Sequence, residues 1–183
     1  MPIPEVPFTI ISWDFITGLL KDKHGNDSVI VLRDYTCKVT GLGAAREEMD
    51  APQLAKLSEK TYFSRFGVPT AIVSDRGSLF TSKFWTEFAN TLGIQRKLTT
   101  AHRPQADGHT ERLNQDVEKF LRAFVSYDQS DWSDWLRMAE FAINSAVHTS
   151  LHMSPFEALY GFQPQWKTDN YEDCMNPQAR KMI

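Results

Sequence analysis

The sequence predicts one α/β domain in which a mixed sheet carries helices on its faces. Two observations lead to this fold class. Three short apolar stretches follow one another near the start, with polar turns between them, and strands and helices then alternate before a run of helices. Strands in hairpin connection followed by helical crossovers combine antiparallel and parallel neighbours in one sheet. A length of 183 residues is sufficient for one domain with a complete core.

The first strand is expected within residues 8–16, where both alternating faces are apolar. This pattern is typical of a central strand that is covered on both sides. Asp14 lies in the middle of the stretch, and a buried carboxylate is unfavourable without a cation or hydrogen-bond donors. A polar turn with Gly25 follows, and residues 28–32 and 38–42 are predicted to form the next two strands.

The middle of the chain alternates between helices and strands. A helix is predicted over residues 51–66, because Pro52 fits a first helical turn and a broad apolar face follows it. A strand is expected over residues 71–74. A helix with an apolar residue at every fourth position should cover residues 84–92, and a short strand residues 94–98.

A polar segment and a long helix come next. Residues 99–109 contain Pro104 and Gly108 and are predicted to form a mobile loop. The helix is expected to begin at Glu111 and to end near Tyr127. At 100° per residue, Glu111 points away from the apolar stripe of this helix, which suits a carboxylate aimed into a cleft.

Two shorter helices are expected towards the end of the chain. One should cover residues 131–147, and the other should run to Tyr160 from a Ser-Pro-Phe-Glu capping box that begins at Ser154. Residues 1–163 are therefore assigned to the core domain. Residues 164–183 are polar and turn-rich, and a loosely packed tail is expected there.

The overall charge argues against a general nucleic-acid binder. The net charge is −3 and the pI about 5.9, whereas such proteins are usually basic. DNA binding remains compatible with this balance if metal neutralises the acids or if basic segments lie outside the chain. Cys37 and Cys174 cannot form a disulfide framework or a CxxC zinc site. We expect neither a membrane span nor a signal peptide, and Met1 before PIPEVP is typical of a piece of a longer polypeptide.

Three acids are candidates for one metal site. Asp75 directly follows an apolar strand, 35 residues lie between it and Glu111, and Asp14 stands in the first strand. Sites in open α/β sheets form at the carboxyl ends of strands. Oxygen ligands without nitrogen or sulfur select a hard cation, Mg²⁺ or Mn²⁺. A pair of such ions stabilises the attacking and leaving oxygens in phosphoryl transfer. Our hypothesis is that these acids hold two ions and that the protein cuts and joins DNA.

Each acid also has a structural alternative. Asp75 before Arg76 and Gly77 is, taken alone, more often a turn residue. Glu111, taken alone, is better explained as a first-turn acid that the helix dipole favours. Asp14 is the most informative, because an acid inside a two-sided apolar strand is uncommon.

Four other polar residues receive structural interpretations. Asp34 ends the second strand and is interpreted as structural or as a support for the site. Cys37 is expected to be a half-buried strand residue. His102 and His109 lack partners at zinc-site spacing, so a solvated loop is the preferred interpretation for both.

Several segments resemble one known family. The string IVSDRGSLFTSKFW, the spacing to Glu111, the segment RPQADGHTERLNQ and the late VHTSLHMSPFEALYG occur in this order. Together they are similar to the integrase catalytic core of Ty3/gypsy-type retrotransposons with long terminal repeats. The integrases of these elements are relatives of retroviral integrases. WDFITGLL resembles the first catalytic strand of that family, and the similarity extends from about Trp13 to Gly161.

The resemblance implies a ribonuclease-H-like fold with a five-stranded mixed sheet flanked by helices. It implies that Asp14, Asp75 and Glu111 are the metal triad, holding two Mg²⁺ or Mn²⁺ ions. The implied enzyme is a polynucleotidyl transferase that performs 3′-processing of the element's DNA ends and strand transfer into target DNA. Isolated cores of the family tend to retain disintegration, the reverse reaction. The implied location is the nucleus, besides the cytoplasmic virus-like particle.

The resemblance also implies contacts with DNA. One position falls where retroviral relatives touch target DNA, and others fall in the loop that meets the element's DNA end. Relatives carry lysines beyond the catalytic Glu, where this chain has Gln115 and Glu118, so two neighbouring cations are the expected substitutes. The positions expected to contact DNA are Ser78, His102, Arg103, Asp107, Arg112 and Lys119.

The implied partners are DNA and further copies of the chain. The core is expected to dimerise through residues 51–66 and the helices after Asp131, and to form a higher oligomer on DNA. No membrane partner is expected, and chromatin partners would bind through segments outside this chain. After the second strand the family tends to have VVVDRLSK, whereas this chain has VLRDYTCK and is divergent there.

Two alternative functions remain open. One is a domesticated, non-catalytic module that dimerises or binds chromatin or DNA, against which the intact triad argues. The other is a ribonuclease-H-like nuclease, against which the PQ-x-DG segment and the SPFEALYG end argue.

Overall fold

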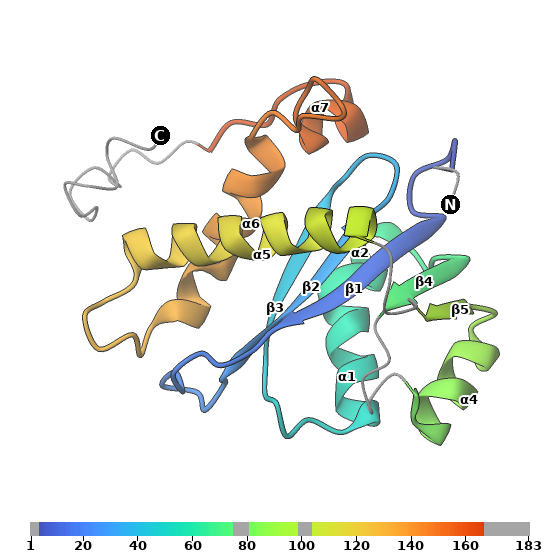
Figure 1. Ribbon diagram of the computed structural model, residues 1–183, viewed down its shortest axis with the longest axis horizontal. Helices are drawn as coiled ribbons and strands as arrows, with labels where there is room; N and C mark the ends of the chain where they lie inside the picture. Colours follow the sequence, from blue (N-terminus) through green and yellow to red (C-terminus); the bar gives the residue numbers. More distant parts are fainter. Residues whose placement is uncertain (1–3, 75–80, 99–103, 167–183) are drawn as a thin grey trace.

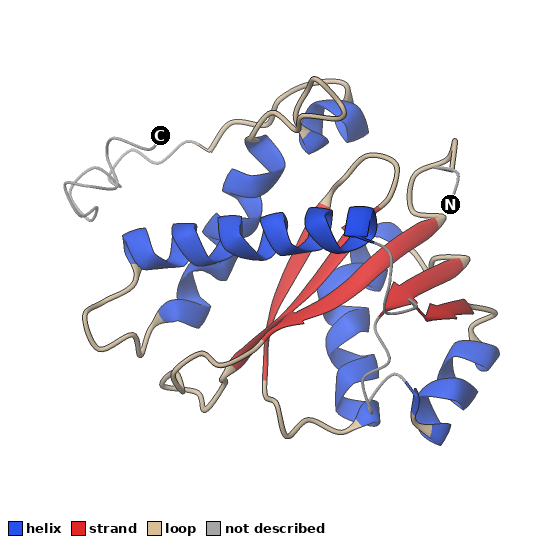
Figure 2. Cartoon of the chain, viewed as in Figure 1, coloured by secondary structure: helices blue, strands red, loops and turns tan. Residues whose placement is uncertain are grey.

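A five-stranded mixed sheet forms the centre of the protein, in a computed structural model that describes residues 4–74, 81–98 and 104–166. The strand order is β3-β2-β1-β4-β5. β1 pairs antiparallel with β2 and parallel with β4, so the predicted mixed sheet is confirmed (Figure 2). The strands are β1 (Ile10–Ile16), β2 (Ser28–Asp34), β3 (Thr40–Ala45), β4 (Ala71–Ser74) and β5 (Gln95–Leu98).

Helices cover both faces of this sheet. α5 crosses one face in front of β1, β2 and β3, and α1 lies behind the sheet (Figure 1). The helical elements are α1 (Ala51–Ser58), η1 (Glu59–Phe63), α2 (Ser64–Phe66), α4 (Lys83–Thr91), α5 (Pro104–Phe124), η2 (Trp132–Trp135), α6 (Leu136–Ser145) and α7 (Pro155–Tyr160).

The two faces bury separate apolar cores. On one face Trp13 of β1 packs edge-on against Trp85 of α4, with ring centroids 4.7 Å apart, and Leu54 of α1 joins them. On the other face Val31 of β2 and Val117 of α5 belong to one buried cluster. Residues of both clusters alternate along β1, as expected for a strand covered on both sides.

The helix predicted over residues 51–66 is not a continuous α-helix. Its middle, Glu59–Phe63, is a π-helical segment between α1 and α2. Thr61, Tyr62 and Phe63 are consecutive and all buried. In an α-helix three consecutive side chains span roughly 200°. The wider π turn brings all three closer to the sheet side, which explains the departure.

Two further boundaries differ from the prediction. α5 begins at Pro104 rather than at Glu111, so half of the expected loop is helical. Proline is harmless at a first helical position, where its missing N–H would have no partner in any case. The helix predicted over residues 131–147 begins with the 3-10 turn Trp132–Trp135 and ends as α6 at Ser145. Residues 99–103 lie outside the described structure.

The turn between β2 and β3 is organised by Asp34. Its buried carboxylate accepts the backbone N–H groups of Phe8 at 2.7 Å, Thr36 at 2.9 Å and Cys37 at 2.7 Å. Asp34 is therefore structural, as interpreted from the sequence. Cys37 is not a half-buried strand residue: it lies in this turn, fully buried, and burial raises the pKa of its thiol to about 12.

The edge strand β3 is protected by side chains of α6. Asn144 accepts the Thr40 N–H and donates to the Thr40 carbonyl oxygen, both at 2.8 Å. Glu140 accepts the Leu42 N–H at 2.9 Å and forms an ion pair with Arg65. Unpaired edge groups are templates for pairing with another chain. These side chains therefore occupy positions that a sixth strand would take.

The capping box predicted at Ser154 is confirmed at the start of α7. The Ser154 side chain accepts the Glu157 N–H, and the Glu157 carboxylate accepts the Ser154 N–H at 2.8 Å. Gly161 ends α7 in the left-handed conformation. Residues 167–183 lie outside the described part, so the boundary between core and tail stays a prediction. Within the described residues, no helix is long and apolar enough to cross a membrane.

Replacing Tyr62 by Phe is expected to stabilise the fold by about 1 kcal/mol. The Tyr62 hydroxyl is buried and has no hydrogen-bond partner in the described structure, and burial raises the pKa of the phenol. Phenylalanine keeps the ring contacts with Phe8 and Phe66 and removes the unpaired oxygen. The melting temperature should rise by about 2–4 °C. The exposed Tyr127→Phe variant is the control, and a lower melting temperature for Tyr62→Phe would contradict the assignment.

Candidate active site

Asp14 stands on the central strand, on the face covered by α5. Its Cα partner in β2 is Val31, and the carboxylate is half-buried. Alternation along β1 puts Asp14 on the same side as Ile16, which belongs to the apolar cluster under α5. An acid within the central strand is therefore present as predicted, between the sheet and the helix.

Asn114 connects Asp14 to α5. Its Nδ2 donates to Asp14 Oδ2 at 2.8 Å. The neighbouring Leu113 and Val117 are buried against the sheet and fix the helix above β1. The Asn114 Oδ1 is also buried and has no hydrogen-bond partner in the described part of the chain. The site thus contains a carboxylate that is oriented by an amide and a second oxygen without a donor.

Asn114 was not among the residues predicted from the sequence. The available clue was its spacing: it follows Glu111 by three residues, and such positions are neighbours on a helix surface. The clue was weak, because a lone asparagine beside an apolar stripe is compatible with an ordinary solvated position.

The second acid follows β4. This strand ends at Ser74, whose Cα partner in the parallel β1 is Trp13, the residue before Asp14. Asp75 is the next residue in the sequence. Asp75 itself and the predicted DNA contact Ser78 are not among the described residues, and the same holds for His102 and Arg103.

The third acid belongs to α5. Position 111 lies about two turns inside the helix and not at its start, as the sequence had suggested. The helix dipole acts within the first turn, so it does not explain an acid at this position. The backbone of Glu111 and Asp107 is described, and their side chains are not.

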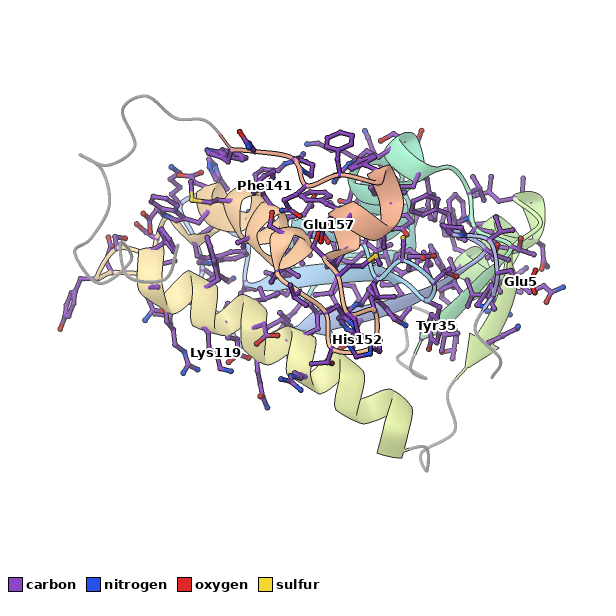
Figure 3. The ribbon with its side chains drawn as sticks, turned by 90° about the horizontal axis from the view of Figure 1, so that it is seen from above. Glu5, Tyr35, Lys119, Phe141, His152 and Glu157 are labelled. Carbon is purple, nitrogen blue, oxygen red and sulfur yellow. The ribbon has the colours of Figure 1, made fainter. Side chains whose placement is uncertain are left out.

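Two predicted DNA contacts lie on the exposed surface of α5. Arg112 is exposed, and Lys119 Nζ lies 3.7 Å from Asp116 Oδ1. In the view from above, Lys119 lies along α5 and Tyr35 at the β2–β3 turn, with His152 between them (Figure 3). Because the side chains of Arg112 and Lys119 are exposed, both cations are accessible to a large polyanion.

The donor atoms around Asp14 fit a hard cation. The Asp14 carboxylate and the unpaired Asn114 amide oxygen are both oxygen donors, the kind that Mg²⁺ prefers. A group of three His, Cys, Asp or Glu does not occur within residues 4–74, 81–98 and the described side chains of 104–166. Asp75 and the Glu111 side chain lie outside these residues.

Solved structures of retroviral integrases have the same fold. The BIV integrase catalytic core is 21% identical, with a TM-score of 0.63 over 82% of this chain and 92% of that chain. The HTLV-2 integrase catalytic core, in complex with magnesium in a trimeric form, is 16% identical, with a TM-score of 0.67 over 84% and 97%. The simian T-cell lymphotropic virus intasome in complex with PP2A regulatory subunit B56 gamma is 16% identical, with a TM-score of 0.71 over 93% and 61%. The fold is therefore ribonuclease-H-like, as the resemblance implied.

The sequence itself gives the family. The family model described as integrase core domain matches residues 4–104, more than half of the chain, and the chain belongs to this family. The transposon Tf2-3 and Tf2-4 polyproteins of Schizosaccharomyces pombe are each 34% identical over 165 residues, which is 89% of this chain. The chain spans only 12% of the length of these polyproteins. The predicted resemblance to the integrase core of retrotransposons and retroviruses is confirmed.

Proposed function

We propose that this chain is the catalytic core of a DNA integrase that performs metal-dependent 3′-processing and strand transfer of retrotransposon DNA ends. Membership of the integrase core family supports an integrase function in general. The observation that carries the catalytic part is the hydrogen bond from Asn114 to Asp14, which holds α5 against the carboxylate of the central strand.

The proposed metal ligands are Asp14, Asp75 and Glu111. Asp75 follows Ser74 directly, and Ser74 pairs with the neighbour of Asp14. Position 111 precedes Asn114 by nearly one turn of α5. Both positions therefore lie on the same side of the helix, the side from which Asn114 contacts Asp14. When bound, two Mg²⁺ or Mn²⁺ ions would supply activation of the attacking oxygen and stabilisation of the leaving oxygen. Magnesium in the related HTLV-2 core supports this choice of ion.

The residues of the chain supply orientation and charge. The Asn114 side-chain amide does not ionise at neutral pH. Its hydrogen bond from Nδ2 to Asp14 Oδ2 therefore orients the carboxylate without protonating it. The other carboxylate oxygen is then left for a ligand. Trp13 and Ile16 are buried on either side of the strand and keep the Asp14 backbone rigid.

DNA is the proposed substrate, contacted from α5 and the segments before it. Arg112 and Lys119 are exposed cations on α5 and are suited to phosphate groups. The other proposed contacts are Ser78, His102, Arg103 and Asp107. Because this chain spans a small part of the Tf2 polyproteins, basic segments outside it would supply further DNA affinity.

Assembly and location are proposed from the same family membership. A homodimer of the core and a higher oligomer on DNA agree with the intasome and the trimeric form named for the related viral proteins. Chromatin partners would bind outside this chain. Integration into target DNA requires the nucleus as the site of action.

Incubation with branched DNA is expected to give metal-dependent disintegration products. The purified chain is mixed with the substrate in Mg²⁺, in Mn²⁺ and in EDTA, and products are resolved on a denaturing gel. Discrete resolution products in metal, and none in EDTA, are the expected result. A Glu111→Gln variant purified in parallel is the control, and any products that it forms would come from a contaminating nuclease. Random nicks would favour the nuclease alternative. A well-folded chain without products, even with its flanking segments restored, would refute the proposal.

A further inference from the structure

Two cations near the β2–β3 turn have no ion-pair partner in the described structure. Arg33 follows Val29 and Val31 along β2 on the face covered by α5, with Ser12 of β1 opposite it. Lys38 stands in the turn that follows. The ion pairs formed within the described residues involve neither of them, although the net charge of the whole chain is −3.

The guanidinium of Arg33 is partly desolvated and unpaired. Its Nε is buried without a hydrogen-bond partner in the described part of the chain. Burial lowers the pKa of Arg33 to about 10, and the attraction of Asp116 only partly opposes this effect. Asp116 is itself exposed and 3.7 Å from Lys119. A desolvated cation without a partner is unfavourable, and a bound anion would offset that penalty.

Lys38 adds a second cation near Arg33, which pairs in β3 with Thr40, two residues after Lys38. Its Nζ donates to the Tyr35 carbonyl oxygen at 2.6 Å and lies 5.8 Å from the centre of the Tyr35 ring. Burial and then the charge of Arg33 lower the pKa of Lys38. Asp34 acts in the opposite direction, but its carboxylate already accepts three backbone N–H groups. The mutual repulsion of Arg33 and Lys38 would be relieved by an anion between them.

α5 separates this pair of cations from the candidate active site. Asn114 contacts Asp14, whereas Arg33 lies opposite Ser12, two residues earlier in β1, where the charge of Asp116 attracts it. Residues 114 and 116 differ by roughly 200° around the helix, so they lie on opposite flanks. A ligand that reaches both flanks must cross α5, as an extended polyanion does.

We propose that Arg33 and Lys38 bind a backbone phosphate of DNA on the flank of α5 opposite Asp14. This inference rests on the proposed integrase function for the identity of the polyanion. Both residues lie in VLRDYTCK, the segment in which the sequence departs from its family resemblance. The site would therefore be a feature of this chain that anchors DNA beside the catalytic groups.

The test is the salt dependence of DNA binding by charge-removing variants. Arg33→Met and Lys38→Met keep an apolar stem and remove the charge. Arg137→Met in α6 removes the same charge from an exposed position and is the matched control. Fluorescence anisotropy of a short labelled duplex is recorded in EDTA between about 50 and 200 mM KCl. Each of the first two variants should weaken binding about fivefold and reduce the slope of log K against log salt by about 0.9; the control should retain the parental slope.

The melting temperature separates an anion site from a structural role. Arg33→Met should melt at or above the parental temperature, because Arg33 has no ion-pair partner within the described residues. Three results would overturn the proposal: a parental chain that does not bind the duplex at the lowest salt, an equal loss for Arg137→Met, or an unchanged slope for Arg33→Met. Binding is measured in EDTA, so the two proposals fail separately. A chain that gives no products even with its flanking segments restored, but shows the Arg33-dependent slope, would refute the integrase proposal and leave the phosphate site intact.

Discussion

Asp14→Asn is expected to lower the rate of metal-dependent DNA processing on the order of 10³-fold, since a bound metal stabilises the transition state by several kcal/mol. The substitution removes the charge that a divalent ion requires. It retains an oxygen at position 14 that accepts the Asn114 Nδ2 hydrogen bond, so β1 and α5 stay connected. The rate is measured under single-turnover conditions with branched DNA, and the melting temperature in metal-free buffer.

Two variants make the result specific. Glu87→Gln removes one carboxylate from an exposed position on α4, and its rate should stay within about twofold of the parent. Asp14→Leu removes both the charge and the acceptor, so it should lose activity and also stability, because the Asn114 amide is then left without its partner. A rate for Asp14→Asn above one tenth of the parental rate would contradict the role of Asp14 as a metal ligand.

The sequence was sufficient to place the elements whose patterns are local. The two-sided apolar stretch around Asp14 predicted the central strand, and β4 was predicted with its bounds. The capping box at Ser154 was correct, because a cap depends only on residues within one turn of each other. These features depend on backbone geometry and neighbouring side chains, and such information is contained in a short window.

Features that depend on contacts across the fold were missed. The π-helical segment Glu59–Phe63 follows from the packing of this helix against β3, which no local pattern records. The early start of α5 at Pro104 was hidden by residues that also suit a loop. Asn114 acquires its role only because α5 lies above β1, and that contact joins residues 100 positions apart.

The end of β2 gives a third case. Residues 28–32 were predicted as the strand, with Asp34 at its end, and the observed strand Ser28–Asp34 includes Arg33 and Asp34 as paired residues. Polar residues at a strand end usually indicate a turn. Here the Asp34 carboxylate is satisfied by backbone donors of the turn, and Arg33 lies on the face of the sheet that α5 covers. The unpaired cation could therefore not be anticipated from composition or periodicity.

Gly43→Ala is expected to destabilise the fold by about 2–3 kcal/mol, which corresponds to a fall of about 5–10 °C in melting temperature. A Cβ at position 43 would lie 2.6 Å from Thr61 Oγ1 and 2.9 Å from Ile30 Cγ2. Both distances are shorter than a Cβ approaches a neighbouring oxygen or carbon atom without a clash, and Ile30 is fully buried in the core. The π-helical segment that carries Thr61 would have to move away from β3. Thermal unfolding of the parent and the variant measures the effect.

Gly41 and Thr61 supply the comparison that isolates this close approach. A Cβ at Gly41 would meet Tyr62 Cδ2 at 3.2 Å and the Thr61 carbonyl oxygen at 3.3 Å, so Gly41→Ala should have a clearly smaller effect than Gly43→Ala. Thr61→Ala removes the Oγ1 that Gly43→Ala would contact. Combined with Gly43→Ala it should therefore recover about 1 kcal/mol relative to the sum of the single effects. Additive losses, or a larger effect at Gly41 than at Gly43, would show that the approach of Thr61 to β3 does not set the packing of this helix. The expected results would instead mean that a residue without a Cβ is required at position 43, where the π-helical segment meets the sheet. This contact lies on the face opposite α5 and the candidate active site.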